Sequence, residues 1–212
     1  MSNIQNKYFF LFGIFIFFGL TFFASPADAA TYTCNSCADC TTKINNASAG
    51  DVVKLMRNLW FPRDTRVCIE WQTSGVTFSC GRRTGCSVDP GNSRASFVKL
   101  VGDNNTMSTF LYPFWILKRI RAPLVIDILG SNNLLHGIVI DGRWAHQGYA
   151  IAISGGVNNT ISDSSIYKGG VLLRNTENNT IINSSFAHLR YGVTFASNSH
   201  NNTLFFNRVC QP

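Results

Sequence analysis

The sequence predicts an all-β solenoid, a parallel β-helix in which short coils stack on one another. A motif recurs along its C-terminal half, and 21 Asn and 17 Gly give it a turn-rich composition. Only 14% of the residues are charged, against about 25% in an average soluble domain. The 45% of hydrophobic residues excludes a disordered chain. A helical bundle is excluded as well, because it would be rich in Ala, Glu, Lys and Leu.

Residues 1–29 have the pattern of a secretory signal peptide. Lys7 precedes an apolar run from Tyr8 to Phe23, and Ala27-Asp28-Ala29 then supplies a small-residue cleavage site. An uncleaved anchor is the alternative, but a spanning helix needs about 20 apolar residues. We therefore expect cleavage, contact with the membrane only during export, and a secreted, cell-surface or periplasmic protein.

Residues 30–95 are expected to form a cysteine-containing cap and the first coil. The seven cysteines all follow the signal segment: Cys34, Cys37, Cys40, Cys68, Cys80, Cys86 and Cys210. Outside the cell the default state of cysteine is the disulfide, and an odd number leaves at least one thiol over. We expect bridges from the N-terminal cluster to Cys68, Cys80 or Cys86, with the connectivity open. The alternative is a soft metal site at Cys34, Cys37 and Cys40, but no fourth ligand follows at zinc-finger spacing.

Residues 96–212 contain the repeat that decides the fold class. Paired asparagines recur at nearly regular intervals, at 104–105, 132–133, 158–159, 178–179 and 201–202. Three columns follow the later pairs: Leu135, Ile161, Ile181 and Leu204; then Ile138, Ser164, Ser184 and Asn207; then Ile140, Ile166, Phe186 and Val209. After the first pair, Met107, Phe110 and Tyr112 fit these columns more loosely. A unit of about 20 residues cannot bury its own apolar face, so neighbouring units must stack.

A second register of glycines supports the first. Gly148, Gly170 and Gly192 each open an apolar strand, at 149–153, 171–173 and 193–195. Each repeat therefore consists of a strand, a variable turn, a Gly, a second strand and an Asn-rich turn. Ser164, Ser184 and Asn207 are expected where the chain bends, with side chains that satisfy backbone groups.

Three segments depart from the regular pattern. Gly81-Arg82-Arg83-Thr84-Gly85-Cys86 interrupts it, and the pattern is lost until about Phe97. Residues 107–121 are bulky and basic, which predicts an inserted loop or an irregular coil. The last strand has no capping segment after it, and an uncapped solenoid exposes a sheet edge. We expect that end to be covered by a partner or by further chain.

From about Asn132 to Val209 the sequence resembles the β-helix repeat of NosD-type periplasmic copper-maturation proteins, which carbohydrate-binding proteins and sugar hydrolases share. The stretches 178–186 and 192–195 are typical of it. The segments 34–40, 49–55, 68–70 and 76–80 resemble the opening of secreted right-handed β-helix proteins. The resemblance implies a right-handed parallel β-helix with a disulfide-bonded N-terminal cap. It does not select a function, because this scaffold carries enzymes and binders alike.

The catalytic motifs of the resembled enzymes are not found. β-Helix hydrolases place two or three carboxylates together, one to protonate the leaving oxygen and one to activate water. The candidates are Asp127, Asp141, Asp163 and Glu177, and none of them is doubled in the sequence. Asp163 is expected to point into solvent, and Asp141 with Gly142 to form a turn.

Basic residues follow the variable turns of successive repeats and predict a binding strip. The basic strip consists of Arg143, His146, Lys168, His188 and Arg190. Such a strip attracts acidic polysaccharide by charge, with Tyr167 and Tyr191 beside it. The alternative is that these are solubilising side chains at turns.

The sequence therefore predicts a secreted or surface non-catalytic β-helix protein that binds carbohydrate or another surface. The alternatives are a polysaccharide lyase or glycoside hydrolase of the β-helix type and a NosD-type copper protein. No cofactor is predicted, since neither copper nor calcium has a motif here: the mature chain has only Met56 and Met107, and its four His are scattered. Nucleic acid is not expected as a partner, although the net charge is +7, because the cations are dispersed in an exported chain.

Overall fold

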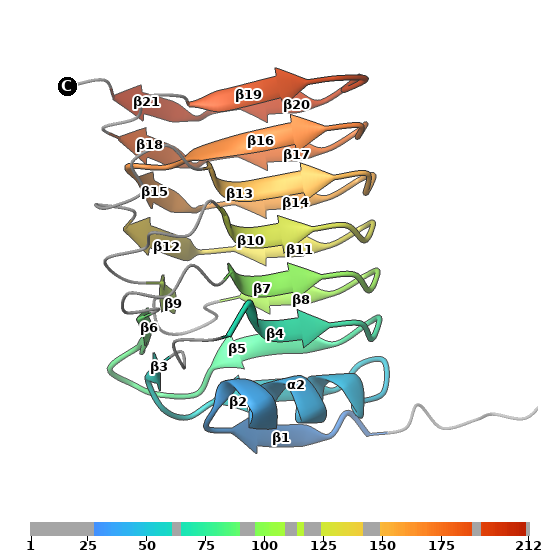
Figure 1. The fold of residues 1–212 in the computed structure, drawn as a ribbon, viewed down its shortest axis with the longest axis vertical. Coiled ribbons are helices and arrows are strands. Elements are labelled where there is room, and N and C mark those ends of the chain that lie inside the picture. Colours follow the sequence, from blue (N-terminus) through green and yellow to red (C-terminus); the bar gives the residue numbers. More distant parts are fainter. Residues whose placement is uncertain are drawn as a thin grey trace, which may run out of the picture.

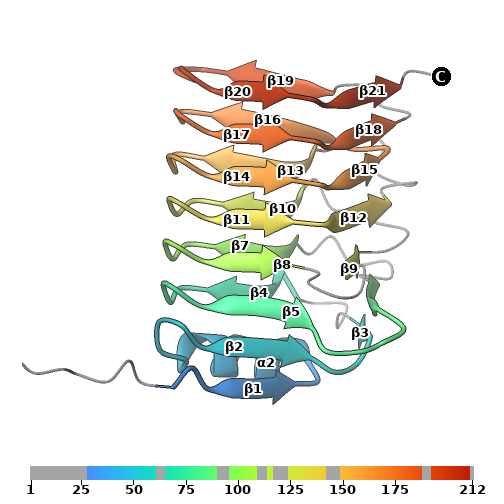
Figure 2. The ribbon, with the colours of Figure 1, turned by 180° about the vertical axis from the view of Figure 1, so that it is seen from behind.

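The chain folds into a parallel β-solenoid, which confirms the predicted fold class (Figures 1 and 2). The structure is a computed structural model and describes residues 28–60, 65–89, 96–108, 114–116, 124–141, 149–187 and 192–210. The predicted signal peptide lies almost entirely outside these residues. Strands pair in parallel in three sheets of eight, six and seven strands, which run along the stack of coils. The predicted boundary between residues 95 and 96 falls in the connection between the strands 86–89 and 96–100.

Each sheet takes one short strand from nearly every coil. The eight-stranded sheet contains β1 (Thr31–Cys34), β2 (Val52–Leu55), β5 (Thr77–Cys80), β8 (Thr106–Ser108), β11 (Leu134–His136), β14 (Thr160–Ser162), β17 (Thr180–Ile182) and β20 (Thr203–Phe205). The six-stranded sheet contains β4 (Val67–Trp71), β7 (Ser96–Leu100), β10 (Leu124–Ile128), β13 (Tyr149–Ser154), β16 (Gly170–Arg174) and β19 (Val193–Ala196). The seven-stranded sheet contains β3 (Leu59–Trp60), β6 (Cys86–Asp89), β9 (Phe114–Ile116), β12 (Ile138–Asp141), β15 (Ser165–Tyr167), β18 (Ser185–Ala187) and β21 (Arg208–Cys210).

The predicted apolar columns form the interior of the solenoid. Leu135, Ile161, Ile181 and Leu204 are register partners, and the first three are fully buried. Ile140, Ile166, Phe186 and Val209 align in the same way. Because a coil this thin has one interior, every inward position along a strand must be apolar.

Two assignments in these columns are wrong. Met107 pairs with Leu135 as predicted, but the partner of Ile138 is Phe114 and not Phe110, and the partner of Ile140 is Ile116 and not Tyr112. The connection from β8 to β9 is longer than the connection from β11 to β12, so a fixed offset from the Asn pair misses the second strand. Phe110 and Tyr112 lie outside the described residues. The stretch 107–121, predicted to be irregular, thus contributes β9 and part of β8 to the sheets, and β6 lies where no pattern was recognised.

The second Asn of each pair forms a hydrogen-bonded ladder inside the solenoid. Its side-chain oxygen accepts the backbone N–H one coil earlier: Val76 donates to Asn105, Asn105 to Asn133, Asn133 to Asn159, Asn159 to Asn179, and Asn179 to Asn202, each at 2.9 Å. The first four of these asparagines are 0–1% exposed. The ladder satisfies buried backbone groups at a corner where strands cannot.

The first Asn of each pair makes the turn possible. Asn104, Asn132, Asn158, Asn178 and Asn201 all have φ between 52° and 57°, a left-handed conformation that Asn tolerates better than most residues. The predicted role of Asn pairs as turn formers is therefore confirmed. The first Asn of a pair adopts the left-handed conformation of the turn, and the second accepts the hydrogen bond of the ladder.

The small polar residues at the second bend also act as predicted. The N–H of Ile138 donates to Ser164 Oγ at 3.2 Å, that of Ser164 to Ser184 Oγ at 3.2 Å, and that of Ser184 to Asn207 Oδ1 at 2.9 Å. Two polar ladders thus fix two corners of the coil.

A helix that was not predicted, α2 (Cys37–Asn45), covers the first edge of the six-stranded sheet (Figure 1). Thr41 Oγ1 donates to the Cys68 carbonyl at 3.3 Å, Asn45 Nδ2 donates to the Glu70 carbonyl at 2.8 Å, and Asn45 Oδ1 accepts from Gln72 N–H at 2.9 Å. Those groups belong to the unpaired edge of β4 and the residue after it, so the helix closes an edge that would otherwise invite pairing.

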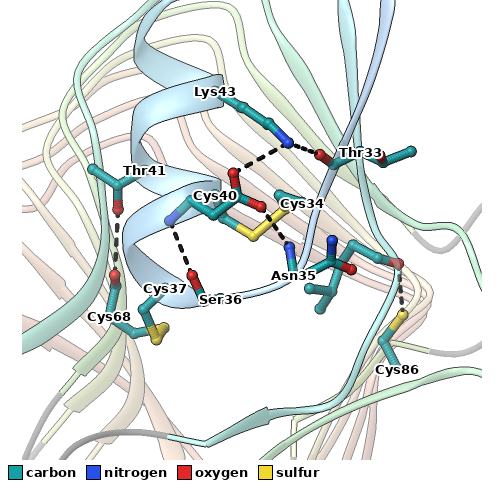
Figure 3. Close-up of a disulfide and its surroundings, with 12 residues drawn as sticks. Thr33, Cys34, Asn35, Ser36, Cys37, Cys40, Thr41, Lys43, Cys68 and Cys86 are labelled. Carbon is teal, nitrogen blue, oxygen red and sulfur yellow. Dashed lines mark hydrogen bonds and ion pairs between the residues drawn. A yellow bond between two sulfur atoms is a disulfide. The ribbon is translucent and has the colours of Figure 1, made fainter.

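The sequence carries a signal for this helix. Ser36 accepts the N–H of Asp39, and Asp39 Oδ2 accepts the N–H of Asn35 at 2.8 Å (Figure 3). Ser-x-x-Asp is close to a capping box, but the three cysteines in the same stretch drew attention to disulfides instead.

Three disulfides join Cys34 to Cys40, Cys37 to Cys68, and Cys80 to Cys86, and Cys210 is free. This agrees with the predicted maximum of three bridges and one remaining thiol, and with stapling of the cluster to Cys68 (Figure 3). The other two bridges differ from the prediction, because Cys34–Cys40 lies within the cluster and Cys80–Cys86 joins two of its expected partners. The thiols of the N-terminal cluster are consumed by these bonds and cannot act as metal ligands. Three disulfides favour an oxidising compartment, such as the extracellular space or the periplasm.

The last described coil leaves interior positions accessible. Phe195, Leu204 and Val209 continue inward columns, yet they are 48%, 45% and 58% exposed.

Within the described part of the chain, no helix has the length and apolar character to span a membrane.

Candidate functional site

The structure describes one member of the predicted basic strip. Lys168 lies in the turn between β15 and β16, and its Nζ is 5.5 Å from the centroid of the Tyr167 ring. Arg143, His146, His188 and Arg190 lie outside the described residues, as does Tyr191. The predicted basic strip follows the strands β12, β15 and β18. These strands end at one corner of the coil, because their last residues, Asp141, Tyr167 and Ala187, are register partners. The basic strip itself stays a prediction.

A second set of charged side chains lies on the outer face of the six-stranded sheet, the face toward the viewer in Figure 1. Glu70, Lys99 and Asp127 are register partners on β4, β7 and β10. They point outward, because the residues on either side of each one are buried in the interior. We call these three residues and Arg174, farther along the stack on β16, the charged column.

Electrostatic contacts link the members of the charged column. Lys99 Nζ lies 3.3 Å from Glu70 Oε1 and forms an ion pair with it. Asp127 is influenced by Lys99 on one side and by Arg174 on the other. Both cations are at the surface, so they remain accessible to an anionic or hydroxylated ligand.

Asp127 has a perturbed proton affinity. Its half-buried position raises its pKa, because burial disfavours the charged form. The positive charges of Arg174 and Lys99 and a hydrogen bond from Ser154 oppose this rise and do not cancel it. The Oδ1 atom of Asp127 is buried and has no hydrogen-bond partner among the described residues.

The four carboxylates considered for catalysis do not come together. Asp127 lies within β10, Asp141 ends β12, Asp163 lies in the turn between β14 and β15, and Glu177 lies in the turn between β16 and β17. Stacking of coils aligns only residues at the same position around the coil, and these four positions all differ. None of them forms with another the carboxylate pair that glycoside hydrolysis requires.

Asp163 is exposed, as predicted, and has a local partner. Its Oδ2 lies 3.2 Å from His136 Nδ1, and Asn183 Nδ2 donates to its Oδ1. Ser162 Oγ lies 3.0 Å from the same His136 nitrogen. Because Ser162 and Asp163 share one ring nitrogen, this cluster lacks the geometry of a Ser-His-Asp relay, which uses both nitrogens.

No metal centre is found in the described part of the chain. There, no three His, Cys, Asp or Glu side chains are arranged to hold an ion. His136 ends β11 and His200 lies in the turn between β19 and β20, whereas His146 and His188 lie outside the described residues.

The sequence analysis missed Glu70, Lys99 and Arg174. A signal existed for the first two, because Glu70, Lys99 and Asp127 repeat at coil spacing, whereas Arg174 pairs with Ser154 and lies two positions beyond the register column of Asp127. The step along the chain from Lys99 to Asp127 equals the step between the Asn pairs that begin at Asn104 and Asn132. The step from Glu70 to Lys99 is longer by a single position.

Neither a protein-family profile nor a curated protein matches this chain. Among solved structures, the chain is similar to an alginate lyase from Paenibacillus sp. str. FPU-7, at 11% sequence identity. The similarity covers 86% of this chain and 98% of that chain, with a TM-score of 0.31. A TM-score of this size carries no conclusion about the activity of this chain.

Proposed function

We propose that this chain is an exported, non-catalytic β-solenoid protein that binds acidic polysaccharide along the outer face of the six-stranded sheet. The observation that carries the proposal is the charged column, which presents Lys99 and Arg174 on one outward surface. Lys168, two residues before β16, adds a cation near the start of a strand of the same sheet, and the Tyr167 ring lies beside this cation.

The architecture suits a long, regular ligand. A solenoid presents equivalent positions about every 4.8 Å along its axis, so an extended polymer can contact several coils at once. Each contact can be weak, because many of them add along the polymer. Attraction by charge also needs no exact arrangement of acid and base, and the dispersed carboxylates fit a binder better than a hydrolase.

Affinity chromatography on polygalacturonate, alginate and uncharged dextran tests this proposal. The mature protein is expected to bind the two acidic columns and to elute with salt, because screening weakens exposed charge contacts. Replacing Lys99, Lys168 and Arg174 together with Glu should weaken binding at least about tenfold. Arg208→Glu changes the net charge on a different sheet and serves as the control, with little effect.

Two results would overturn the proposal. One is equal binding by the triple variant and the native protein. The other is release of new reducing ends or unsaturated uronate from either acidic polymer, which would show an enzyme.

Asp127 is the observation that favours the second candidate, a polysaccharide lyase or hydrolase. A carboxyl with a raised pKa between two cations is typical of functional sites. If the protein is an enzyme at this face, Asp127→Asn should abolish cleavage while retention on the column persists. A protein without cleavage activity on the same polymers excludes this candidate.

A further inference from the structure

The Cys80–Cys86 disulfide closes a short loop that displays two arginines. We call residues 80–86 the arginine loop. Its tip is a tight turn in which Gly85 N–H donates to the Arg82 carbonyl at 3.1 Å, with Gly85 at φ +81°. Cys86 Sγ lies 3.3 Å from the Leu55 carbonyl oxygen (Figure 3). A loop closed by a disulfide and anchored at its end holds its side chains with little freedom to lose on binding.

The arginine loop is fixed against the preceding coil. Arg82 Nη1 donates to Asn58 Oδ1 at 2.7 Å, and the same oxygen accepts the N–H of Ser87 at 3.1 Å. At Gly81 an added Cβ would lie 2.4 Å from Met56 Sδ and 3.1 Å from Lys54 Cβ. The loop therefore packs directly on the segment that joins β2 to β3.

This packing brings Arg82 to the segment of chain that leads into Trp60. Trp60, on the edge strand β3, is 73% exposed and lies two residues after Asn58, the hydrogen-bond partner of Arg82. Lys54 and Arg57 belong to the same stretch of chain, and Arg83 follows Arg82 in the arginine loop. Among the described residues, none of these cations takes part in an ion pair. One carboxylate, Asp89, is the register partner of Trp60. A Trp that is 73% exposed is unusual, because Trp is normally buried for the most part.

We propose that the arginine loop and Trp60 form a second binding site, which takes one anionic unit of an acidic polysaccharide. The guanidinium groups of Arg82 and Arg83 bind the carboxylate, whose planar geometry Arg matches with two parallel hydrogen bonds. The Trp60 indole packs against the apolar face of the sugar ring. The assignment of a saccharide as ligand rests on the proposed function. The site itself lies at the β3 and β6 end of the seven-stranded sheet, away from the charged column on the six-stranded sheet.

Titration calorimetry with an oligogalacturonate, and with its methyl ester as the uncharged counterpart, tests this site. The native protein should bind the acid at least about tenfold more tightly than the ester. Arg82→Ala with Arg83→Ala should remove that preference, whereas Lys99→Ala with Arg174→Ala, on the other face, should leave at least half of the binding enthalpy. Trp60→Phe should retain binding and Trp60→Ala should lose it, since the ring is the contact.

Circular dichroism checks that each variant is folded. The variant with Arg82→Lys and Arg83→Lys is a second control: it keeps the charge but loses the paired hydrogen bonds, so it should bind the oligogalacturonate several-fold more weakly than the native protein. Full binding by the Arg82→Ala, Arg83→Ala variant overturns this inference and leaves the proposed function standing. If only the variant with Lys99→Ala and Arg174→Ala loses binding, this inference is also overturned and the proposed function still stands. Tight binding to phosphatidylserine vesicles with no binding to the oligogalacturonate also overturns it, in favour of a membrane surface.

Discussion

From Asn105 onward, side-chain amides join each coil to the one before it, whereas disulfides hold the first coils together. In the regular part, the ladder from Asn105 to Asn202 repeats one 2.9 Å hydrogen bond at the same corner. In the N-terminal part, Cys37–Cys68 ties α2 to β4, and Cys80–Cys86 closes the arginine loop. The two parts solve the same problem of stacking coils with different chemistry.

The ladder is interrupted at a single position in the described chain. Asp51, Val76 and Asn105 occupy one column, because the residues after them are register partners. Asp51 Oδ1 accepts the Ala30 N–H at 2.8 Å, as an Asn of the ladder would. Val76 has no acceptor, and the Asp51 N–H bonds to the Ser48 carbonyl instead. The interruption falls in the N-terminal coils, where the local hydrogen bond to Ser48 replaces the missing rung.

Removal of the long staple is expected to have the largest effect on stability. The Cys37–Cys68 bridge spans 31 residues, so replacing both cysteines with Ser should lower the free energy of unfolding by about 4 kcal/mol. The Cys80–Cys86 bridge spans 6 residues and should contribute about 2 kcal/mol. Urea denaturation of the mature protein measures both. Equal losses would show that loop size does not explain how the N-terminal coils are held.

A methyl group in the regular corner is the next largest perturbation. At Gly130 a Cβ would lie 2.1 Å from the Gly102 carbonyl oxygen, so Gly130→Ala should cost about 3 kcal/mol. At Gly155 a Cβ meets nothing within 4 Å, although φ is +94°, and Gly155→Ala should cost about 1 kcal/mol. Thermal unfolding compares the two variants. If Gly155→Ala is the more damaging, backbone conformation and not close stacking limits this corner.

Removal of one rung tests the ladder directly. Asn159→Ala deletes the acceptor for the buried Asn133 N–H and should cost about 2 kcal/mol. Hydrogen exchange should speed up around Asn133 and leave the stapled coils unchanged. Asn158→Gly is the matched control, since φ of 57° suits Gly, and should change stability by less than about 0.5 kcal/mol. If hydrogen exchange speeds up equally along the whole chain, the regular part and the N-terminal part are not held together independently.

Asp127, on the outer face of the regular part, should give the smallest effect. Its folded pKa lies above the ordinary value, so its contribution to stability is present below the unfolded pKa and is lost as pH rises through the folded pKa. Asp127→Asn cannot ionise and should gain less than about 1 kcal/mol at pH 7, because solvent screens a half-buried group. The gain should vanish below about pH 4. Melting temperatures at pH 3.5 and pH 7 measure it, and a loss at pH 7 would show that attraction to Arg174 and Lys99 outweighs burial.

The interior could be predicted because its requirements repeat. Leu135, Ile161 and Ile181 had to be apolar in every coil, and Ser164 and Ser184 had to bond to backbone at every bend. The prediction failed where the spacing changed, at Ile116, because the loop before β9 is longer than its counterparts. Outward residues such as Lys99 obey no interior rule, so their alignment was not recognised.

The sequence by itself determined that the chain is a parallel solenoid with Asn-rich turns, an N-terminal stretch stapled by disulfides and a leftover thiol. Only the tertiary structure decided that Cys37 pairs with Cys68, that Glu70, Lys99 and Asp127 share a column, and that the arginine loop lies beside the segment leading to Trp60. The physical reason is that periodic burial constrains residue types at regular positions. Contacts on the outside depend instead on register, and the unequal lengths of successive coils hide that register in the sequence.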